Sequence, residues 1–177
     1  MLGQRLYLGF YRLFYNAFSV VSLLPVLAWV GADPGPLIWD VEGAGGLVLL
    51  GVQGLGALGL LVSILQIDWL QFAGLRQALA YLAGEPLPLP PEPMVAVGMY
   101  RLVRHPLYLF SLLFIWAAPQ MSAAWLGFCL GSTLYFAVGS LLEERKLIRQ
   151  FGPAYLEYRG RVPWMIPGVK LPTVKKP

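Results

Sequence analysis

Polar side chains that could do chemistry gather in two segments of an otherwise apolar chain. The first, residues 98–108, reads GMYRLVRHPLY and holds the one histidine of the sequence, His105. The second, residues 142–167, reads LEERKLIRQFGPAYLEYRGRVPWMIP and holds an adjacent pair of carboxylates and two tyrosines. Because Pro106 disfavours helical backbone at the residue before it, we expect His105 on a bend at the start of an apolar helix.

The adjacent carboxylates Glu143 and Glu144 cannot form an acid–base dyad if they lie on a helix. Neighbouring helical side chains point about 100° apart. We expect Glu144 in particular on a solvated helix face, paired with Lys146 and Arg149. One histidine, one cysteine (Cys129) and no acidic cluster predict neither a metal site nor an intrachain disulfide.

The composition predicts which kind of protein must position these residues. Of 177 residues, 58% are hydrophobic and 12% are charged, and the mean hydropathy is +0.64. Soluble domains usually have about 25% charged residues. These values exclude a disordered chain, a coiled coil and an ordinary soluble enzyme. The net charge of +4 is spread among long apolar runs, so it favours orientation in a membrane over a nucleic-acid partner.

The apolar runs predict an all-α membrane bundle of four spans, at residues 6–30, 44–66, 106–121 and 122–142. The third span is short, about 24 Å if helical, and should form a tight helical hairpin with the fourth. The fourth run continues into charged residues, which predicts one helix leaving the membrane without a break. Gly152 would end it in the left-handed conformation, and Pro153 would start a short new helix. The six glycines of the second run predict a helix-packing face.

Charge placement predicts the orientation. Lys and Arg occur near the N-terminus, between Arg76 and Arg104, and after Arg145, whereas residues 31–43 have none. Both termini are therefore expected in the cytoplasm, in a bacterial or archaeal inner membrane, as one domain over residues 1–177. Residues 67–82 are expected as a helix at the interface or as an extension of the second span. Head groups of anionic lipids are the expected partners of five basic residues: Arg159, Arg161, Lys170, Lys175 and Lys176.

The two polar segments resemble one known family. The pattern Gly-x-Tyr-x-x-x-Arg-His-Pro-x-Tyr, then a helical hairpin, then Glu-Glu-x-x-Leu-x-x-x-Phe-Gly-x-x-Tyr-x-x-Tyr-x-x-x-Val-Pro resembles the isoprenylcysteine carboxyl methyltransferase family of integral membrane enzymes. This family includes bacterial methanethiol S-methyltransferases and phospholipid methyltransferases. The resemblance covers residues 94–167, and the segment 114–121 (FIWAAPQM) is most similar to the methanethiol-type members.

The resemblance implies a cytoplasmic pocket for S-adenosylmethionine, formed by residues 92–108 and 142–167 around the hairpin. The cofactor-binding residues that it implies are Met94, Val95, Gly98, Tyr100, Arg104, His105, Pro106, Leu107, Tyr108 and Glu143. A carboxylate such as Glu143 suits the cofactor's ammonium group, and Arg101 or Arg104 its carboxylate. Aromatic faces suit its adenine and sulfonium. No catalytic residue is assigned.

The sequence also departs from the family pattern. The family's substrate-binding arginine, four residues before the first glutamate, is replaced by Gly139, which argues against a prenylcysteine acceptor. Phe110 stands where glycine is frequent and is expected to narrow the pocket or the route from the lipid. The implied acceptor is a lipophilic or small thiol, a carboxylate or a lipid amine. Two alternatives stay open, namely an NADPH-dependent enzyme similar to sterol reductases and a non-enzymatic membrane accessory protein.

Overall fold

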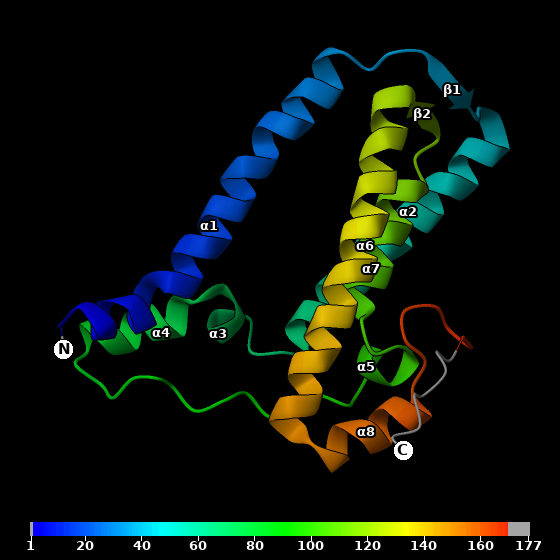
Figure 1. Ribbon diagram of the computed structural model, residues 1–177. Coiled ribbons are helices and arrows are strands. Elements are labelled where there is room, and N and C mark those ends of the chain that lie inside the picture. Colours follow the sequence, from blue (N-terminus) through cyan, green and yellow to red (C-terminus); the bar gives the residue numbers. More distant parts are fainter. Residues whose placement is uncertain (1, 170–177) are drawn as a thin grey trace. The chain divides into compact units, whose positions relative to one another are not determined.

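The computed structural model describes residues 2–169 and is mostly helical (Figure 1). Its elements are α1 (Leu2–Ala32), β1 (Leu37–Asp40), α2 (Gly43–Leu65), α3 (Trp69–Ala73), α4 (Leu75–Leu82), α5 (Met99–Leu102), α6 (Pro106–Trp116), β2 (Gln120–Ser122), α7 (Ala123–Phe151) and α8 (Pro153–Arg161). Contacts divide the chain into two compact units. The first joins the chain up to Asp33 with residues 67–93, and the second joins residues 34–66 with the chain from Met94 onward.

Three of the described helices, α1, α2 and α7, are long and apolar enough to cross a membrane. They correspond to the first, second and fourth predicted spans, and they indicate an integral membrane protein. Their surfaces agree with lipid as the solvent, since large apolar side chains such as Phe14, Leu47 and Leu134 are about 70% exposed (69%, 71% and 67%). That the whole chain is one domain stays a prediction.

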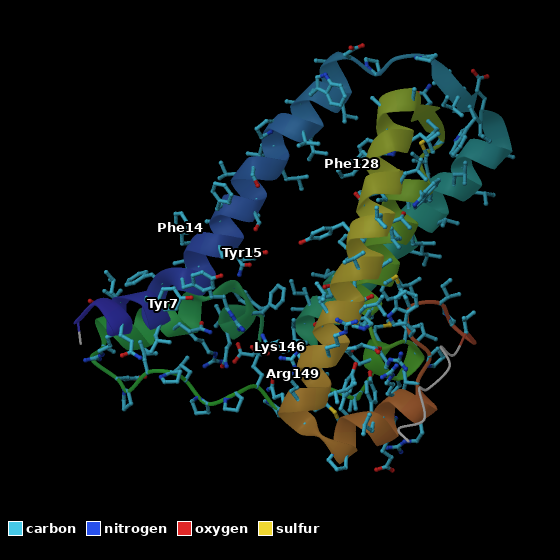
Figure 2. The ribbon with its side chains drawn as sticks, in the orientation of Figure 1. Tyr7, Phe14, Tyr15, Phe128, Lys146 and Arg149 are labelled. Carbon is cyan, nitrogen blue, oxygen red and sulfur yellow. The ribbon has the colours of Figure 1, made fainter. Side chains whose placement is uncertain are left out.

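In the first unit, α3 and α4 pack against α1, where exposed aromatic side chains such as Tyr7, Phe14 and Tyr15 follow one another along the helix (Figure 2). The expected helix over 67–82 is broken at Gly74, whose φ of 91° favours glycine. A Cβ at this position would overlap the α1 backbone at Leu13. Since α2 ends at Leu65, these helices do not extend the second span, and that alternative was wrong.

In the second unit, α2 and α6 lie side by side, and two glycines of α2 allow the close approach. A Cβ on Gly56 would lie 2.8 Å from the backbone nitrogen of Phe114, and one on Gly59 would overlap the Phe110 ring. The predicted packing face is confirmed at these two positions. Phe110 is therefore directed at α2, and the glycine opposite it leaves room for the ring.

The third span was predicted as one helix over residues 106–121, and this prediction was wrong for residues 117–121. The helix α6 has 11 residues, roughly 16 Å, and the chain then continues in extended form through Pro119 to β2. Buried backbone there has partners within the protein: the Trp39 indole donates to the carbonyl of Ala118 (3.2 Å), and the amide of Val41 donates to the carbonyl of Pro119 (3.0 Å).

This extended segment also corrects the all-α prediction. β1 and β2 form a two-stranded antiparallel ladder, with Trp39 opposite Met121 and Asp40 opposite Gln120. Ser122 then caps α7 by accepting a hydrogen bond from the amide of Trp125 (3.2 Å).

The helix α7 continues from the apolar run into the charged stretch, as predicted, and ends at Phe151. Gly152 has φ 57° and ψ −129°, so the backbone is one that glycine adopts, but it is not the expected left-handed helical conformation. Pro153 begins α8, as predicted.

Candidate active site

The segment from Val103 to Pro106 is the centre of the candidate site. The short helix α5 ends at Leu102, Val103 is extended, and His105 has φ −122° and ψ 64° before Pro106 starts α6. The expected bend at His105 is therefore confirmed. Its backbone is held by the C-terminal segment, because the amide of Arg104 donates to the carbonyl of Pro163 (2.9 Å) and the amide of His105 to that of Trp164 (3.3 Å).

The guanidinium of Arg104 connects this bend to two helices. Its Nε donates to Oε1 of Glu144 on α7 at 2.7 Å, and both side chains are almost fully buried. Its Nη1 donates to the carbonyls of Arg159 (2.8 Å) and Val162 (3.0 Å), at the C-terminal end of α8. Arg104 therefore satisfies helix-terminal carbonyls and compensates a buried carboxylate with one side chain.

The imidazole of His105 lies between the two glutamates. Its Nδ1 is 3.5 Å from Oε2 of Glu143, and its Nε2 is 3.5 Å from Oε1 of Glu144. Burial of the ring disfavours its charged form, but the two carboxylates outweigh this, so the pKa of His105 is raised above 6.5. The site therefore favours an imidazolium, which is a hydrogen-bond donor at both nitrogens.

Glu143 is directed to the other side of the ring and is half-exposed, with 46% of its side chain accessible. Its Oε2 accepts a hydrogen bond from the phenol of Tyr108 (3.1 Å). The Tyr108 ring stacks between the His105 ring (centroids 5.5 Å apart) and that of Phe136 on α7 (4.9 Å). The accessible carboxylate of Glu143 thus lies beside an aromatic stack formed by His105, Tyr108 and Phe136.

The residues before α5 reach the same end of the unit by packing. Met94 packs against a buried cluster of Tyr155, Tyr158 and Val162. The phenol of Tyr158, whose pKa burial raises to about 12, donates to the carbonyl of Tyr100. Gly98, with φ 54°, lies against the side chain of Gln66, which accepts a hydrogen bond from the amide of Met99 (2.9 Å).

The structure thus brings Arg104, His105, Tyr108 and Glu143 together, and it links Met94, Gly98 and Tyr100 to the same end of the unit through α8 and Gln66. Pro106 is buried at the start of α6, and Val95 and Leu107 are half-buried.

The prediction for Glu144 was wrong. It is 3% exposed and pairs with Arg104, His105 and Arg159, whereas Lys146 and Arg149 extend from the charged end of α7 (Figure 2). Arg159 also pairs with Glu144, its Nε lying 3.3 Å from Oε2 with 20% of the side chain exposed, and its contact with lipid head groups stays a prediction. Arg161 is exposed, and Lys170, Lys175 and Lys176 lie outside the described residues. Gln66 was missed, although it is a polar residue at the end of an apolar run.

Five buried polar atoms around this bend have no hydrogen-bond partner within the described residues, namely Arg104 Nη2, His105 Nε2, Arg159 Nε, the Tyr155 hydroxyl and Trp164 Nε1. Of these, His105 Nε2 and Arg159 Nε lie within ion-pair distance of Glu144, at 3.5 and 3.3 Å. Buried polar groups are normally satisfied, so such a group of donors is typical of a ligand-binding region. The nitrogen donors of Arg104 Nη2 and Trp164 Nε1 and the Tyr155 hydroxyl fit a ligand rich in acceptors, and the carboxylate of Glu143 fits a cationic group.

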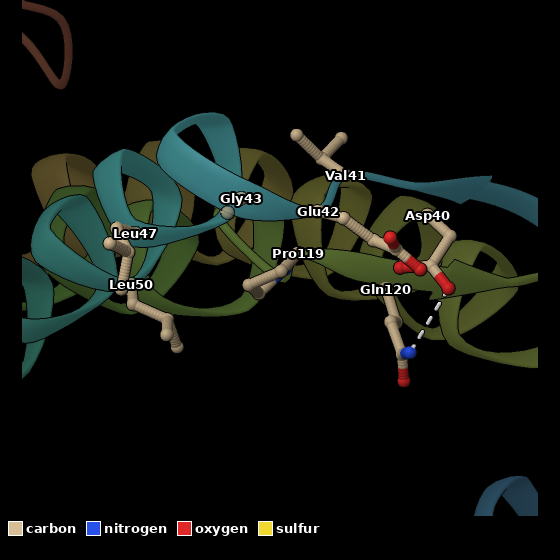
Figure 3. Close-up of a pocket in the computed structure, with 9 residues that line it drawn as sticks. Asp40, Val41, Glu42, Gly43, Leu47, Leu50, Pro119 and Gln120 are labelled. Atoms are coloured by element: carbon tan, nitrogen blue, oxygen red, sulfur yellow. Dashed lines mark hydrogen bonds between the residues drawn. The ribbon is translucent and has the colours of Figure 1, made fainter.

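A separate pocket of about 530 Å³ lies at the other end of α2 (Figure 3). It is lined by Asp40, Val41, Glu42, Gly43, Gly46, Leu47, Leu50, Pro119 and Gln120. Gln120 donates to the carboxylate of Asp40 there (3.1 Å), as the dashed line in Figure 3 shows. This pocket contains none of the predicted site residues.

The chain is similar to several curated proteins named methanethiol S-methyltransferase. It is 38% identical over 149 residues to methanethiol S-methyltransferase 2 of Bradyrhizobium diazoefficiens, which is 84% of this chain and 56% of that protein. It is 36% identical over 154 residues to the Mycobacterium tuberculosis protein (86% and 62%). For the Pseudomonas deceptionensis protein the identity is 33% over 159 residues (87% and 58%).

The chain therefore spans a little over half the length of the curated relatives that it matches. No family model matches it, and neither does any solved structure. The similarity extends over 84% of the chain, so it includes the first polar segment, residues 98–108. The chain is thus a homologue, over most of its own length, of the proteins named methanethiol S-methyltransferase.

Proposed function

We propose that this protein is a membrane methyltransferase that transfers the methyl group of S-adenosylmethionine to a small thiol. The observation that carries the proposal is the 3.5 Å approach of His105 to Glu143 in a homologue of methanethiol S-methyltransferases. These residues come from motifs separated by a helical hairpin. Their convergence at one end of the second unit is what a shared cofactor site requires.

The cofactor supplies an electrophilic methyl group on a sulfonium. The half-exposed carboxylate of Glu143 suits its ammonium group, and the unpartnered Nη2 of Arg104 suits its carboxylate. The faces of Tyr108 and Tyr100 are suited to the adenine or to the sulfonium cation. The residues that would line the site are those that the family resemblance implies, from Met94 to Tyr108 and Glu143.

The chain's own contribution would be alignment and exclusion of water. The bend at His105 is fixed through its backbone and its ring. The residues around the bound methyl donor would therefore not need to change position during the reaction. Both ring nitrogens of His105 face carboxylates at 3.5 Å, so we assign it electrostatic positioning. Direct displacement by a thiolate needs no covalent enzyme intermediate.

A small acceptor is favoured by the surroundings of Tyr108. A Cβ on Gly139 of α7 would lie 3.9 Å from the Tyr108 hydroxyl, so α7 is near the phenol there but presents no cation. An acceptor with a carboxylate would lack a partner at this position. The relatives are named methanethiol S-methyltransferase, and methanethiol is a small thiol.

We also infer that this site faces the cytosol in a bacterial inner membrane, with both termini on that side. The exposed basic residues Arg101, Arg145, Lys146, Arg149 and Arg161 lie at the end of the unit that holds His105. The opposite end has Asp40 and Glu42 around the pocket of Figure 3. This distribution follows the positive-inside rule.

The test is calorimetry of the whole chain in detergent with S-adenosylhomocysteine. We expect a dissociation constant near the micromolar range, about −8 kcal/mol. Glu143→Gln and His105→Ala should weaken binding at least tenfold, and Glu157→Gln, an exposed glutamate of α8, should not. Binding of NADPH instead would favour the reductase alternative, and binding of neither nucleotide would favour the accessory role.

The acceptor is tested separately, with radiolabelled cofactor and three probes: methanethiol, a prenylcysteine and a phospholipid vesicle. Label in volatile product from methanethiol alone is the expected result. Label in prenylcysteine or in lipid would overturn the proposed acceptor while retaining the methyltransferase.

A further inference from the structure

We propose that Glu144 is the positioning residue of this site: its buried carboxylate holds the His105 ring and the Arg104 guanidinium against α7 and α8, while Glu143 is left to meet the ligand. The inference rests on the proposed function for the identity of that ligand. The contacts by which Glu144 holds His105 and Arg104, called the lock below, are properties of the structure and do not depend on the proposed function.

The contacts of Glu144 come from three parts of the chain. Its Oε1 accepts from Arg104 Nε at 2.7 Å and lies 3.5 Å from His105 Nε2, and its Oε2 lies 3.3 Å from Arg159 Nε. The side chains of Glu144, Arg104 and His105 are 3%, 2% and 4% exposed. A carboxylate this deeply buried stays charged only because cationic groups surround it.

The lock acts on the position of His105 from two directions. The Nε2 atom of the His105 ring faces Glu144. Glu144 also orients the side chain of Arg104, the residue before His105, and so holds the backbone of the bend. Arg104 in turn holds the carbonyls of Arg159 and Val162. Removing the charge of Glu144 would therefore release the ring, the bend and the end of α8 together.

The neighbouring glutamate has the complementary environment. Glu143 points about 100° away around α7, is 46% exposed, and contacts the Nδ1 side of the same ring and the Tyr108 phenol. The two carboxylates thus approach one imidazole from opposite sides, and only that of Glu143 is accessible. This difference in burial, at adjacent positions, separates the positioning role from the binding role.

The charged and titratable groups around the ring are Glu143 and Glu144 from α7, Arg104 from the bend, Tyr108 from α6, and Arg159 and Tyr155 from α8. Because His105 is the one histidine in the chain, an imidazole NMR titration of histidine-labelled protein reports this position alone. Such a readout distinguishes an electrostatic lock from a purely structural residue and needs no turnover.

The experiment compares Glu144→Gln with Glu144→Asp, and uses Glu157→Gln as the matched control. Glu144→Gln should lower the imidazole midpoint by about one pH unit. It should also weaken S-adenosylhomocysteine binding at least tenfold and lower kcat/KM by about 100-fold through misplacement of the site. Glu144→Asp, which keeps the charge, should restore most of the midpoint, and Glu157→Gln should match the unmodified protein.

A second variant keeps the proposal testable if Glu144→Gln does not fold. Arg159→Gln removes a cation from the network, so it should raise the imidazole midpoint, opposite in sign to Glu144→Gln. A Glu144→Gln or Arg159→Gln protein with an unchanged midpoint and unchanged binding overturns the lock. If the unmodified protein binds no S-adenosylhomocysteine but its midpoint responds as described, the proposed function fails and the lock stands.

Discussion

Gly59 on α2 and Phe110 on α6 share one contact, in which the aromatic ring occupies the space that a side chain on the glycine would need. Phe110 stands at a position where the family frequently has glycine, and the sequence predicted that its bulk would narrow the pocket or the route from the lipid. In the structure the ring fills the α2–α6 contact. Small residues at such contacts allow helix backbones to approach closely in a membrane.

Gly59→Ala should therefore destabilise the protein by about 1–3 kcal/mol, because the added methyl displaces the Phe110 ring. The measurement is thermal unfolding in detergent. Gly51→Ala is the matched control, since nothing lies within 4 Å of a Cβ there. Equal melting temperatures for the two variants would contradict the described α2–α6 contact.

Much of this fold follows from local sequence patterns. Long apolar runs predicted α1, α2 and α7, and Pro106 and Pro153 predicted where α6 and α8 begin. These signals are local: hydrophobic length sets a span, and a proline ring restricts the residue before it.

The parts that were missed depend on partners far along the chain. Residues 117–121 were predicted as the end of a helical span, and their extended form depends on Trp39 and Val41, about 80 residues earlier. Likewise, the burial of Glu144 depends on Arg104, which is 40 residues away. The sequence motifs predicted where the candidate site lies. They did not predict the buried Arg104–Glu144 ion pair, because charged residues on helices are usually exposed.

Arg104→Met should cost about 3–5 kcal/mol in unfolding free energy, since it leaves Glu144 buried without its closest cation. Arg161→Met removes an exposed ion pair with Glu157 and should cost at most about 1 kcal/mol. Chemical denaturation of both proteins in mixed micelles provides the comparison. Similar losses for the two would mean that Arg104 is not the central cation of the network.

The stability of the protein should fall as the pH rises above neutrality. The pKa of His105 is raised in the folded protein, so the charged ring stabilises the fold fully below its unfolded pKa of about 6.5. That contribution is lost as the pH passes through the folded pKa. Melting temperatures of the unmodified protein should converge with those of His105→Gln at alkaline pH, and a constant difference would refute this linkage.

Gly152→Ala should destabilise the protein by about 1–3 kcal/mol, because its φ and ψ of 57° and −129° are accessible essentially to glycine alone. Gly160→Ala, within α8 and with open space around its Cα, should be neutral or slightly stabilising. Circular dichroism during heating distinguishes the two. An unaffected Gly152→Ala protein would contradict the backbone described between α7 and α8.

The hydrogen bonds of Arg104 make the site depend on contacts from several segments of the chain at once. Its guanidinium and the amides of residues 104 and 105 depend on carbonyls between Arg159 and Trp164. A chain cut at Gly152 would keep each long apolar helix and still insert into lipid. It would nevertheless remove the carbonyls that hold the Arg104 guanidinium and the amides of residues 104 and 105, and leave Glu144 of α7 as the remaining partner of that guanidinium, so membrane insertion and competence to bind a nucleotide are separable properties of this protein.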